Sequence, residues 1–170
     1  MSSSEFTVDS AIPEGPWTLY FHAQDEAKWN LASFTSVGSM ATWRDFWSLM
    51  EGLRTESLAD GMFFLMRDPI PPLWENHQNI RGGSYSIRIQ KRDASEIFIA
   101  YSIAAMLGNM TLNRENLING ISISPKKGFN ILKIWNVDST HFKDPADIHI
   151  LSKEIKPDDI MYTPFVQKKM

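Results

Sequence analysis

The residues best suited to chemistry in this chain lie together in one loop, where Trp74 is followed directly by Glu75. Pro71 and Pro72 come just before them, and because proline fixes φ and lacks a backbone donor, the loop is predicted to be rigid and exposed. An exposed indole offers a face on which a base can stack, and a carboxylate offers two acceptors in one plane. Guanine fits this pair, since its N1–H and 2-amino group are adjacent donors. A tryptophan that fills a core gap beside a solvated glutamate would have the same local sequence.

Two further tryptophans and a basic turn extend this interpretation. Trp29 lies in a polar segment without periodic apolar neighbours, and Trp135 ends a short apolar run. The turn before that run contains Lys126 and Lys127. One arrangement accounts for all of these residues: a base held between two aromatic faces, with its phosphates on the lysines.

In this order and at these spacings, the motifs resemble the eukaryotic translation initiation factor 4E family, whose members bind the 7-methylguanosine cap of mRNA. The resemblance implies an α+β fold in which the concave face of a curved sheet holds the cap. The predicted function is to bind the cap and recruit mRNA for translation initiation, and a cap-sequestering translational repressor is the alternative. The resemblance is carried by Trp17-Thr18-Leu19-Tyr20-Phe21-His22, Trp29, Thr42–Trp47, Phe64–Glu75, Asn79–Gly83 and Ile131–Trp135.

The resemblance implies a role for each residue around the base. Trp29 and Trp74 would sandwich it, because N7 methylation leaves a delocalised positive charge that indole faces attract, by about 2 kcal/mol or more when desolvated. Glu75 would accept charge-assisted hydrogen bonds from N1–H and the 2-amino group. Trp135 would contact the N7-methyl edge.

The phosphate ligands depart from the family pattern. The resemblance places Lys126 and Lys127 against the phosphate chain. Ser84 and the residue that begins the basic turn stand where family members usually carry basic side chains. Lys133 and Arg88 are alternative phosphate ligands, because each lies an even number of residues from a position predicted to face the cap.

The resemblance also implies a surface for a protein partner. Family members bind a Tyr-x-x-x-x-Leu-hydrophobic helix, from an initiation scaffold protein or a translational regulator, on the convex side of the sheet. Here that surface would use Trp43, Trp47, Ala100 and Ala104. Family members usually carry leucines at the two alanine positions, so the chain predicts a wider groove and an altered partner motif.

Composition limits the possible functions. A chain of 170 residues, 43% of them hydrophobic, fits one domain, which we expect over residues 15–170 after a disordered tail over residues 1–14. A formal net charge of -3 argues against general binding of an RNA backbone, because such proteins are basic. The chain has no cysteines, which excludes disulfides and thiolate metal sites. We expect no cofactor, no membrane segment and a cytoplasmic location, with the nucleus left open.

The order of apolar patterns predicts one curved antiparallel sheet with about three helices packed on its convex face. Strands are predicted at Trp17–His22, Ser33–Val37, Met62–Arg67, Ser84–Gln90, Gly120–Ser124 and Phe129–Trp135. Helices are predicted from a capping box of Thr42 and Asp45 to about Leu53, from Ser95 as N-cap to Gly108, and from Pro145 to about Glu154. The core-facing residues of the first two helices are predicted to be Phe46, Leu49, Met50 and Leu53, and Ile99, Ile103, Met106 and Leu107.

An enzyme and a binding module for methylated lysine are the two alternative classes of function. His141 and His149, with Asp144 and Asp147 between them, could ligate a metal, but these spacings fit the capping of a helix better. The chain has no nucleophile motif and no glycine-rich phosphate loop before a helix, so we predict a binding protein without enzymatic activity or metal. An aromatic cage for methylated lysine would also use tryptophans and an acid, but it has no use for a Lys-Lys turn.

Overall fold

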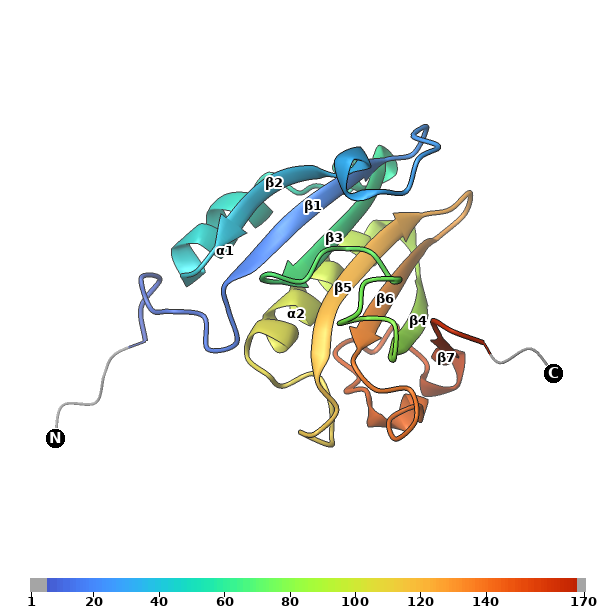
Figure 1. The fold of residues 1–170 in the computed structure, drawn as a ribbon. Coiled ribbons are helices and arrows are strands. Elements are labelled where there is room, and N and C mark those ends of the chain that lie inside the picture. Colours follow the sequence, from blue (N-terminus) through green and yellow to red (C-terminus); the bar gives the residue numbers. More distant parts are fainter. Residues whose placement is uncertain (1–5, 168–170) are drawn as a thin grey trace, which may run out of the picture.

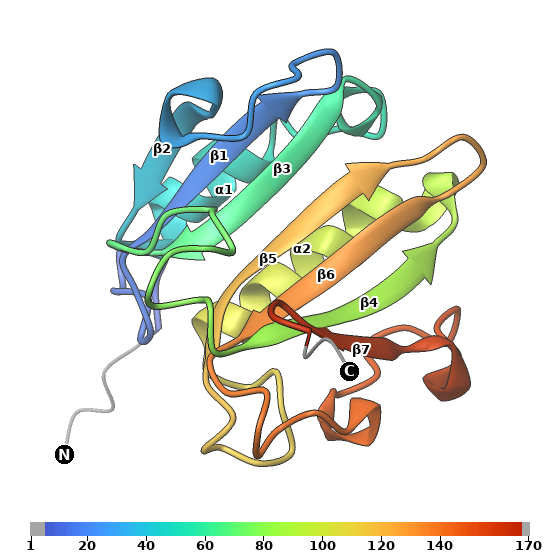
Figure 2. The ribbon, with the colours of Figure 1, turned by 45° about the vertical axis from the view of Figure 1, so that its right-hand side comes forward.

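The computed structural model describes residues 6–167. Its centre is an antiparallel sheet of seven strands in the order β2-β1-β3-β5-β6-β4-β7, with both α-helices on one face (Figures 1 and 2). The strands are β1 Trp17–Ala23, β2 Thr35–Met40, β3 Gly61–Arg67, β4 Gly83–Ile89, β5 Ile118–Pro125, β6 Asn130–Asn136 and β7 Met161–Pro164. The predicted α+β fold is confirmed, as are six of these strands in outline. None of the helices among the described residues is both long and apolar enough to cross a membrane.

Alternation along the strands divides the sheet into two unlike faces. Successive side chains of a strand point to opposite faces. The helix-facing side chains form the main core; in the central strands these are Leu65, Tyr85, Ile87, Ile121, Ile123, Leu132 and Ile134. The opposite face carries a second, smaller apolar cluster of Phe34, Phe64, Met66, Ile70 and Trp135. In Figure 2 this second face is turned to the viewer, and the loop of residues 68–82 crosses in front of it.

Helix α1 spans Trp43–Met50 and begins as predicted. The Asp45 amide donates to the Thr42 hydroxyl, and the Thr42 amide donates to the Asp45 carboxylate, which closes the capping box. Hydrogen bonds from the amides of Ala41 and Thr42 to its carboxylate lower the pKa of Asp45 below its usual value. The helix ends three residues before the predicted Leu53, which is nevertheless buried in the core.

Helix α2 spans Ala94–Met106, and its predicted core face is only partly correct. Met106 is buried as predicted, but Ile99 and Ile103 are only partly covered and Leu107 is exposed. The buried face is formed instead by residues such as Phe98, Tyr101 and Ala105. The helix is apolar on nearly every side, so periodicity could not decide which face meets the sheet. Ser95 is not the N-cap either; it lies in the first turn, and its hydroxyl donates to the carbonyl of Leu53.

The predicted end of α2 is confirmed, whereas the helix predicted after β6 is absent. The predicted stop at Gly108 is confirmed, since this glycine has φ of 67°, a conformation that side chains other than glycine rarely adopt. The predicted third helix is wrong: Asp144 caps only the short 3-10 turn Pro145–Asp147. The chain that follows is irregular and covers α2, where the Tyr101 hydroxyl donates to the carbonyl of His149. It leads into β7, which the sequence did not predict.

The N-terminal segment also differs from its prediction. Residues 1–5 of the predicted disordered tail lie outside the described residues, but residues 6–14 pack against α1. Ile12 is buried in the core, and Ala11 forms a β-bridge with Thr42. The Asp9 carboxylate pairs with the exposed guanidinium of Arg44 at 2.7 Å. The buried side chain of Ile12 and backbone hydrogen bonds to α1 therefore fix residues 6–14, although most of these residues are polar or exposed.

Candidate functional site

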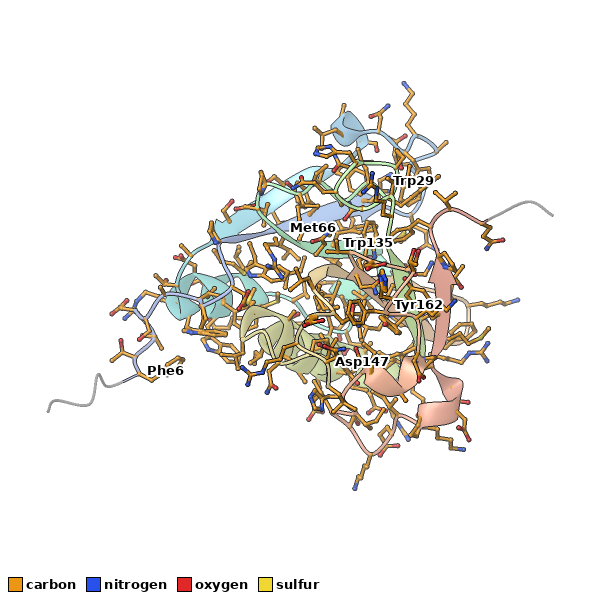
Figure 3. All side chains as sticks on the ribbon, turned by 60° about the horizontal axis from the view of Figure 1, so that its bottom comes forward. Phe6, Trp29, Met66, Trp135, Asp147 and Tyr162 are labelled. Carbon is orange, nitrogen blue, oxygen red and sulfur yellow. The ribbon has the colours of Figure 1, made fainter. Side chains whose placement is uncertain are left out.

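A cavity of about 470 Å³ lies on the sheet face opposite the helices. Its walls come from the β1–β2 connection, the loop after β3 and the segment after β7, and its floor comes from β4, β5 and β6. Five of the residues predicted to form the site line it: Trp29, Trp74, Glu75, Lys133 and Trp135. Trp29 and Trp135 both lie far from Phe6 in Figure 3. Lys126, Lys127 and Arg88 lie outside this lining.

Trp29 is held in place by His22 of β1. The two rings stack 3.8 Å apart and within 7° of parallel, and Phe34 meets both of them edge-on. The His22 ring is almost fully buried; its Nε2 lies 2.7 Å from the Lys28 carbonyl oxygen and its Nδ1 lies 3.1 Å from that of Ala23. Because these carbonyls belong to the last residue of β1 and to the middle of the β1–β2 connection, one ring holds the first half of this connection against the strand. Trp29 stays 53% exposed, consistent with one covered and one free face.

The loop that carries Trp74 and Glu75, predicted to be rigid from its prolines, is crossed by hydrogen bonds from a buried side chain. The buried Asn79 donates through Nδ2 to the carbonyls of Pro71 and Leu73, so the loop is fastened across its own width. Trp74 is 48% exposed and Glu75 is exposed at the rim. The sequence left open whether Trp74 fills the core. Its exposure excludes that alternative.

The floor is formed by Trp135, which is buried. Its Nε1 donates to the Ser122 hydroxyl at 3.3 Å, and its ring packs edge-on against Phe64. Phe165, just after β7, lies 5.1 Å from the Trp135 ring and 6.5 Å from the Trp74 ring, between centroids. Phe165 thereby joins the loop that carries Trp74 to the sheet.

Lys133 is the cation inside the cavity. In the strand register it stands between Ser86 of β4 and Ser122 of β5, so a serine lies beside Lys133 on each neighbouring strand. Burial and the nearby charge of Lys126 lower the pKa of Lys133 below its usual value. Among residues 6–167 Lys133 forms no ion pair, so its charge makes this part of the cavity suited to an anion.

The sequence model of the family "Eukaryotic initiation factor 4E" matches residues 14–163. The chain belongs to this family.

The relatives are distant. Eukaryotic translation initiation factor 4E-1A of Danio rerio is 27% identical over 139 residues, which cover 79% of this chain and 64% of the relative. The corresponding factor of Dictyostelium discoideum is 26% identical and covers 87% of this chain and 62% of the relative. The chain thus spans less than two thirds of the length of these relatives. Among solved structures, the complex of C. elegans eIF4E-3 with the 4E-binding protein Mextli and a cap analog is similar in fold, with a TM-score of 0.67, 20% identity and coverage of 79% of this chain and 77% of that chain. The complex of Ascaris suum eIF4E-3 with m2,2,7G cap is also similar in fold, with a TM-score of 0.64 and 21% identity. This similarity covers 79% of this chain and 77% of that chain.

The surface predicted to bind a protein partner is only partly exposed. Trp47 is 46% exposed and borders a shallow depression of about 320 Å³ formed with Val8 and Arg44. Trp43 and Ala104, also predicted to contact a partner, are buried. Trp43 lies in the main core, and the rotation of α2 carries Ala104 toward the sheet, so neither offers a free surface. Ala100 stays partly exposed.

Two residues of the site were not found from the sequence. His22 ends one of the motifs that carry the resemblance, but the motif gives no sign of its stacking on Trp29, and Phe165 belongs to none of the motifs. The serine floor did leave a signal, since Ser84, Ser86, Ser122 and Ser124 alternate with apolar residues in the way that marks a polar sheet face.

We predict that His22→Ala loosens the β1–β2 loop without unfolding the protein. It removes the hydrogen bond that the ring N–H of a neutral imidazole donates to one of the two carbonyl groups, about 0.5–1.5 kcal/mol, together with the stacking on Trp29. Hydrogen exchange at the Glu26 and Lys28 amides should therefore accelerate by about tenfold or more. His22→Phe keeps the stacking on Trp29 and should give an intermediate rate. His77→Ala, in another loop, is the matched control and should change nothing there. Unchanged exchange in His22→Ala would show that the ring does not hold the loop.

Proposed function

We propose that this protein binds the 7-methylguanosine cap of mRNA in the cavity between Trp29 and Trp74, and that it recruits capped mRNA for translation initiation. One observation carries the proposal. Trp29, Trp74, Glu75 and Trp135 come from three separate segments of the chain and line a single cavity. Two half-exposed indoles on rigid supports are suited to stacking, which binds a cationic base more strongly than a neutral one.

In this proposal Glu75 selects guanine. Its carboxylate would accept from the N1–H and the 2-amino group, whose hydrogen bonds are charge-assisted. Adenine lacks this adjacent pair of donors, so it would leave the carboxylate without a partner, at a cost of about 1–3 kcal/mol. Trp135, which forms the floor, would contact the N7-methyl edge.

For the phosphates we propose Lys133 as the main ligand, with Lys126 and Lys127 from the β5–β6 turn beside it. Lys133 lines the cavity, and Lys126 is close enough to lower the pKa of Lys133. An anion between them would relieve this repulsion, and the hydroxyls of Ser86 and Ser122 could donate to it.

The protein partner we propose is a helical peptide from an initiation scaffold protein or a translational regulator, anchored on Trp47. An indole that is 46% exposed on a helix is a suitable interface anchor. The partly exposed Ala100 would extend the contact along α2, while Trp43 and Ala104 would support it from the core.

The first prediction from the proposed function concerns methylation of the guanine base at N7. The 7-methylguanosine triphosphate should bind at least tens of times tighter than GTP and quench tryptophan fluorescence, because only the methylated base is cationic. Titration of both nucleotides under the same salt conditions measures the ratio, with Trp29→Ala as a variant that should lose most of the difference. Equal affinities would rule out cap binding.

The second prediction separates the base from the phosphates. Glu75→Ala should weaken 7-methylguanosine triphosphate binding by about tenfold or more at every salt concentration, since it removes the acceptor for the base. Lys133→Met should weaken binding at low salt, flatten its salt dependence by about one charge, and raise the melting temperature of the free protein. An unchanged salt slope in Lys133→Met would exclude Lys133 as a phosphate ligand.

The third prediction tests the convex surface with a synthetic helical peptide that carries the family's Tyr-x-x-x-x-Leu-hydrophobic motif. Trp47→Ala should weaken peptide binding by about thirtyfold or more, as loss of an interface anchor does, and leave nucleotide affinity unchanged. Trp29→Ala should do the reverse. If Trp47→Ala left peptide binding intact, the partner surface would lie elsewhere; circular dichroism verifies that the variant is folded.

A further inference from the structure

The face of the sheet that forms the cavity floor continues beyond the cavity toward the β5–β6 turn. Arg88 pairs with Ile131, two residues further along β4 and β6 than the pair of Ser86 and Lys133. Because residues two apart share a strand face about 6.6 Å apart, Arg88 and Ile131 lie one step beyond Lys133. Phe129 lies one step further in the direction of the turn.

This extension is positively charged, although the whole chain carries a net charge of -3. The strands β4, β5 and β6 and the turn between β5 and β6 contain no aspartate or glutamate. Four cations belong to them: Arg88, Lys126, Lys127 and Lys133. Within residues 6–167 none of the four forms an ion pair.

Arg88 and Phe129 form a stacking platform on this face, in which the guanidinium lies over the phenyl ring. The Arg88 guanidinium carbon lies 4.1 Å from the centroid of the Phe129 ring. Arg88 is exposed and Phe129 partly exposed, so the pair is accessible to a ligand. Single-stranded nucleic acids are bound by this combination, in which bases stack on aromatic rings or guanidinium planes while nearby cations contact the backbone.

We propose that Arg88, Phe129 and Ile131 bind the first nucleoside of the RNA that follows the cap. This inference rests on the proposed cap-binding function. A phosphate chain that leaves the cavity over Lys133 reaches Arg88 next, with Lys126 and Lys127 of the turn at its side. The base then stacks on the Arg88–Phe129 platform. Stacking of this kind accepts any base, because every base has a π-face, so the site increases affinity for capped RNA without reading its sequence.

Two ligands distinguish this site from the cap site: 7-methylguanosine triphosphate, and a five-nucleotide RNA with a 7-methylguanosine cap. The wild-type protein should bind the capped RNA at least about fivefold tighter than the nucleotide. Phe129→Ala should remove most of this increment and leave nucleotide affinity within about twofold. Arg88→Gln should also reduce the increment and lower the salt slope for capped RNA by about one. Arg92→Ala, a change at an exposed arginine after β4, is the matched control and should preserve the increment.

The possible results separate the two proposals. Equal wild-type affinities for the two ligands, or an increment that survives both Phe129→Ala and Arg88→Gln, would overturn the second site and leave cap binding intact. A loss of nucleotide affinity equal to the loss of RNA affinity in both variants would also overturn it. A wild-type protein that bound neither ligand would overturn both proposals. Because Arg88 is exposed, Arg88→Gln remains a valid test if Phe129→Ala proves unstable.

Discussion

The buried side chain of Asn136 holds together the strand ends on which the cavity is built. Its Oδ1 accepts hydrogen bonds from the amide of Gly83 and the hydroxyl of Tyr162, and its Nδ2 donates to the Oδ1 of Asn116. One residue thereby joins the ends of β4, β6 and β7 to the segment before β5. Such a network is rigid only when every member is satisfied, because an unpaired polar group inside a protein is costly. Trp135 directly precedes Asn136, so the position of the cavity floor depends on these bonds. The close approach also explains an adjacent glycine: a side chain at residue 82 would meet the backbone oxygen of Asn136.

Local sequence patterns were enough to predict those elements that bury one face and expose the other. Six strands and the start of α1 follow from alternation and a capping box, since each of these features is complete within a few residues. The failures share a different cause. The face of α2 could not be chosen because nearly all of its residues are apolar. The strand β7 has four residues and ends at Pro164, so only its pairing with β4 makes it a strand. In the predicted third helix, Ile148 is buried, but the apolar residues that follow it, Ile150 and Leu151, are exposed. The segment therefore has no single buried helical face, and apart from a short 3-10 turn it stays irregular.

In the candidate site, too, some residues could be predicted from local motifs and others only from tertiary contacts. Trp29, Trp74, Glu75 and Trp135 could be predicted because each lies in a motif with recognisable neighbours. His22 could not, since its role depends on the stacking distance to Trp29 and on two carbonyl groups of the intervening segment. The choice among Lys126, Lys127, Lys133 and Arg88 as phosphate ligands also needed the structure. The sequence placed Lys133 and Arg88 on the same sheet face, as the register confirms. Only the structure shows that, of these four cations, Lys133 is the one that lines the cavity.

The position of Lys133 connects the stability of the protein to its proposed function. A cation that is partly buried beside Lys126 disfavours its own charged form, so in the free protein Lys133 is a source of instability. A bound phosphate would reverse this effect, because the desolvated ammonium attracts an anion more strongly than an exposed one would. Ser86 and Ser122 pair with Lys133 in the strand register, so their hydroxyl groups lie on the neighbouring strands beside it. A chain with net negative charge would in this way hold a highly charged ligand locally, through one desolvated cation and the exposed lysines of the adjacent turn. The rest of the acidic surface would discourage nonspecific contact with RNA.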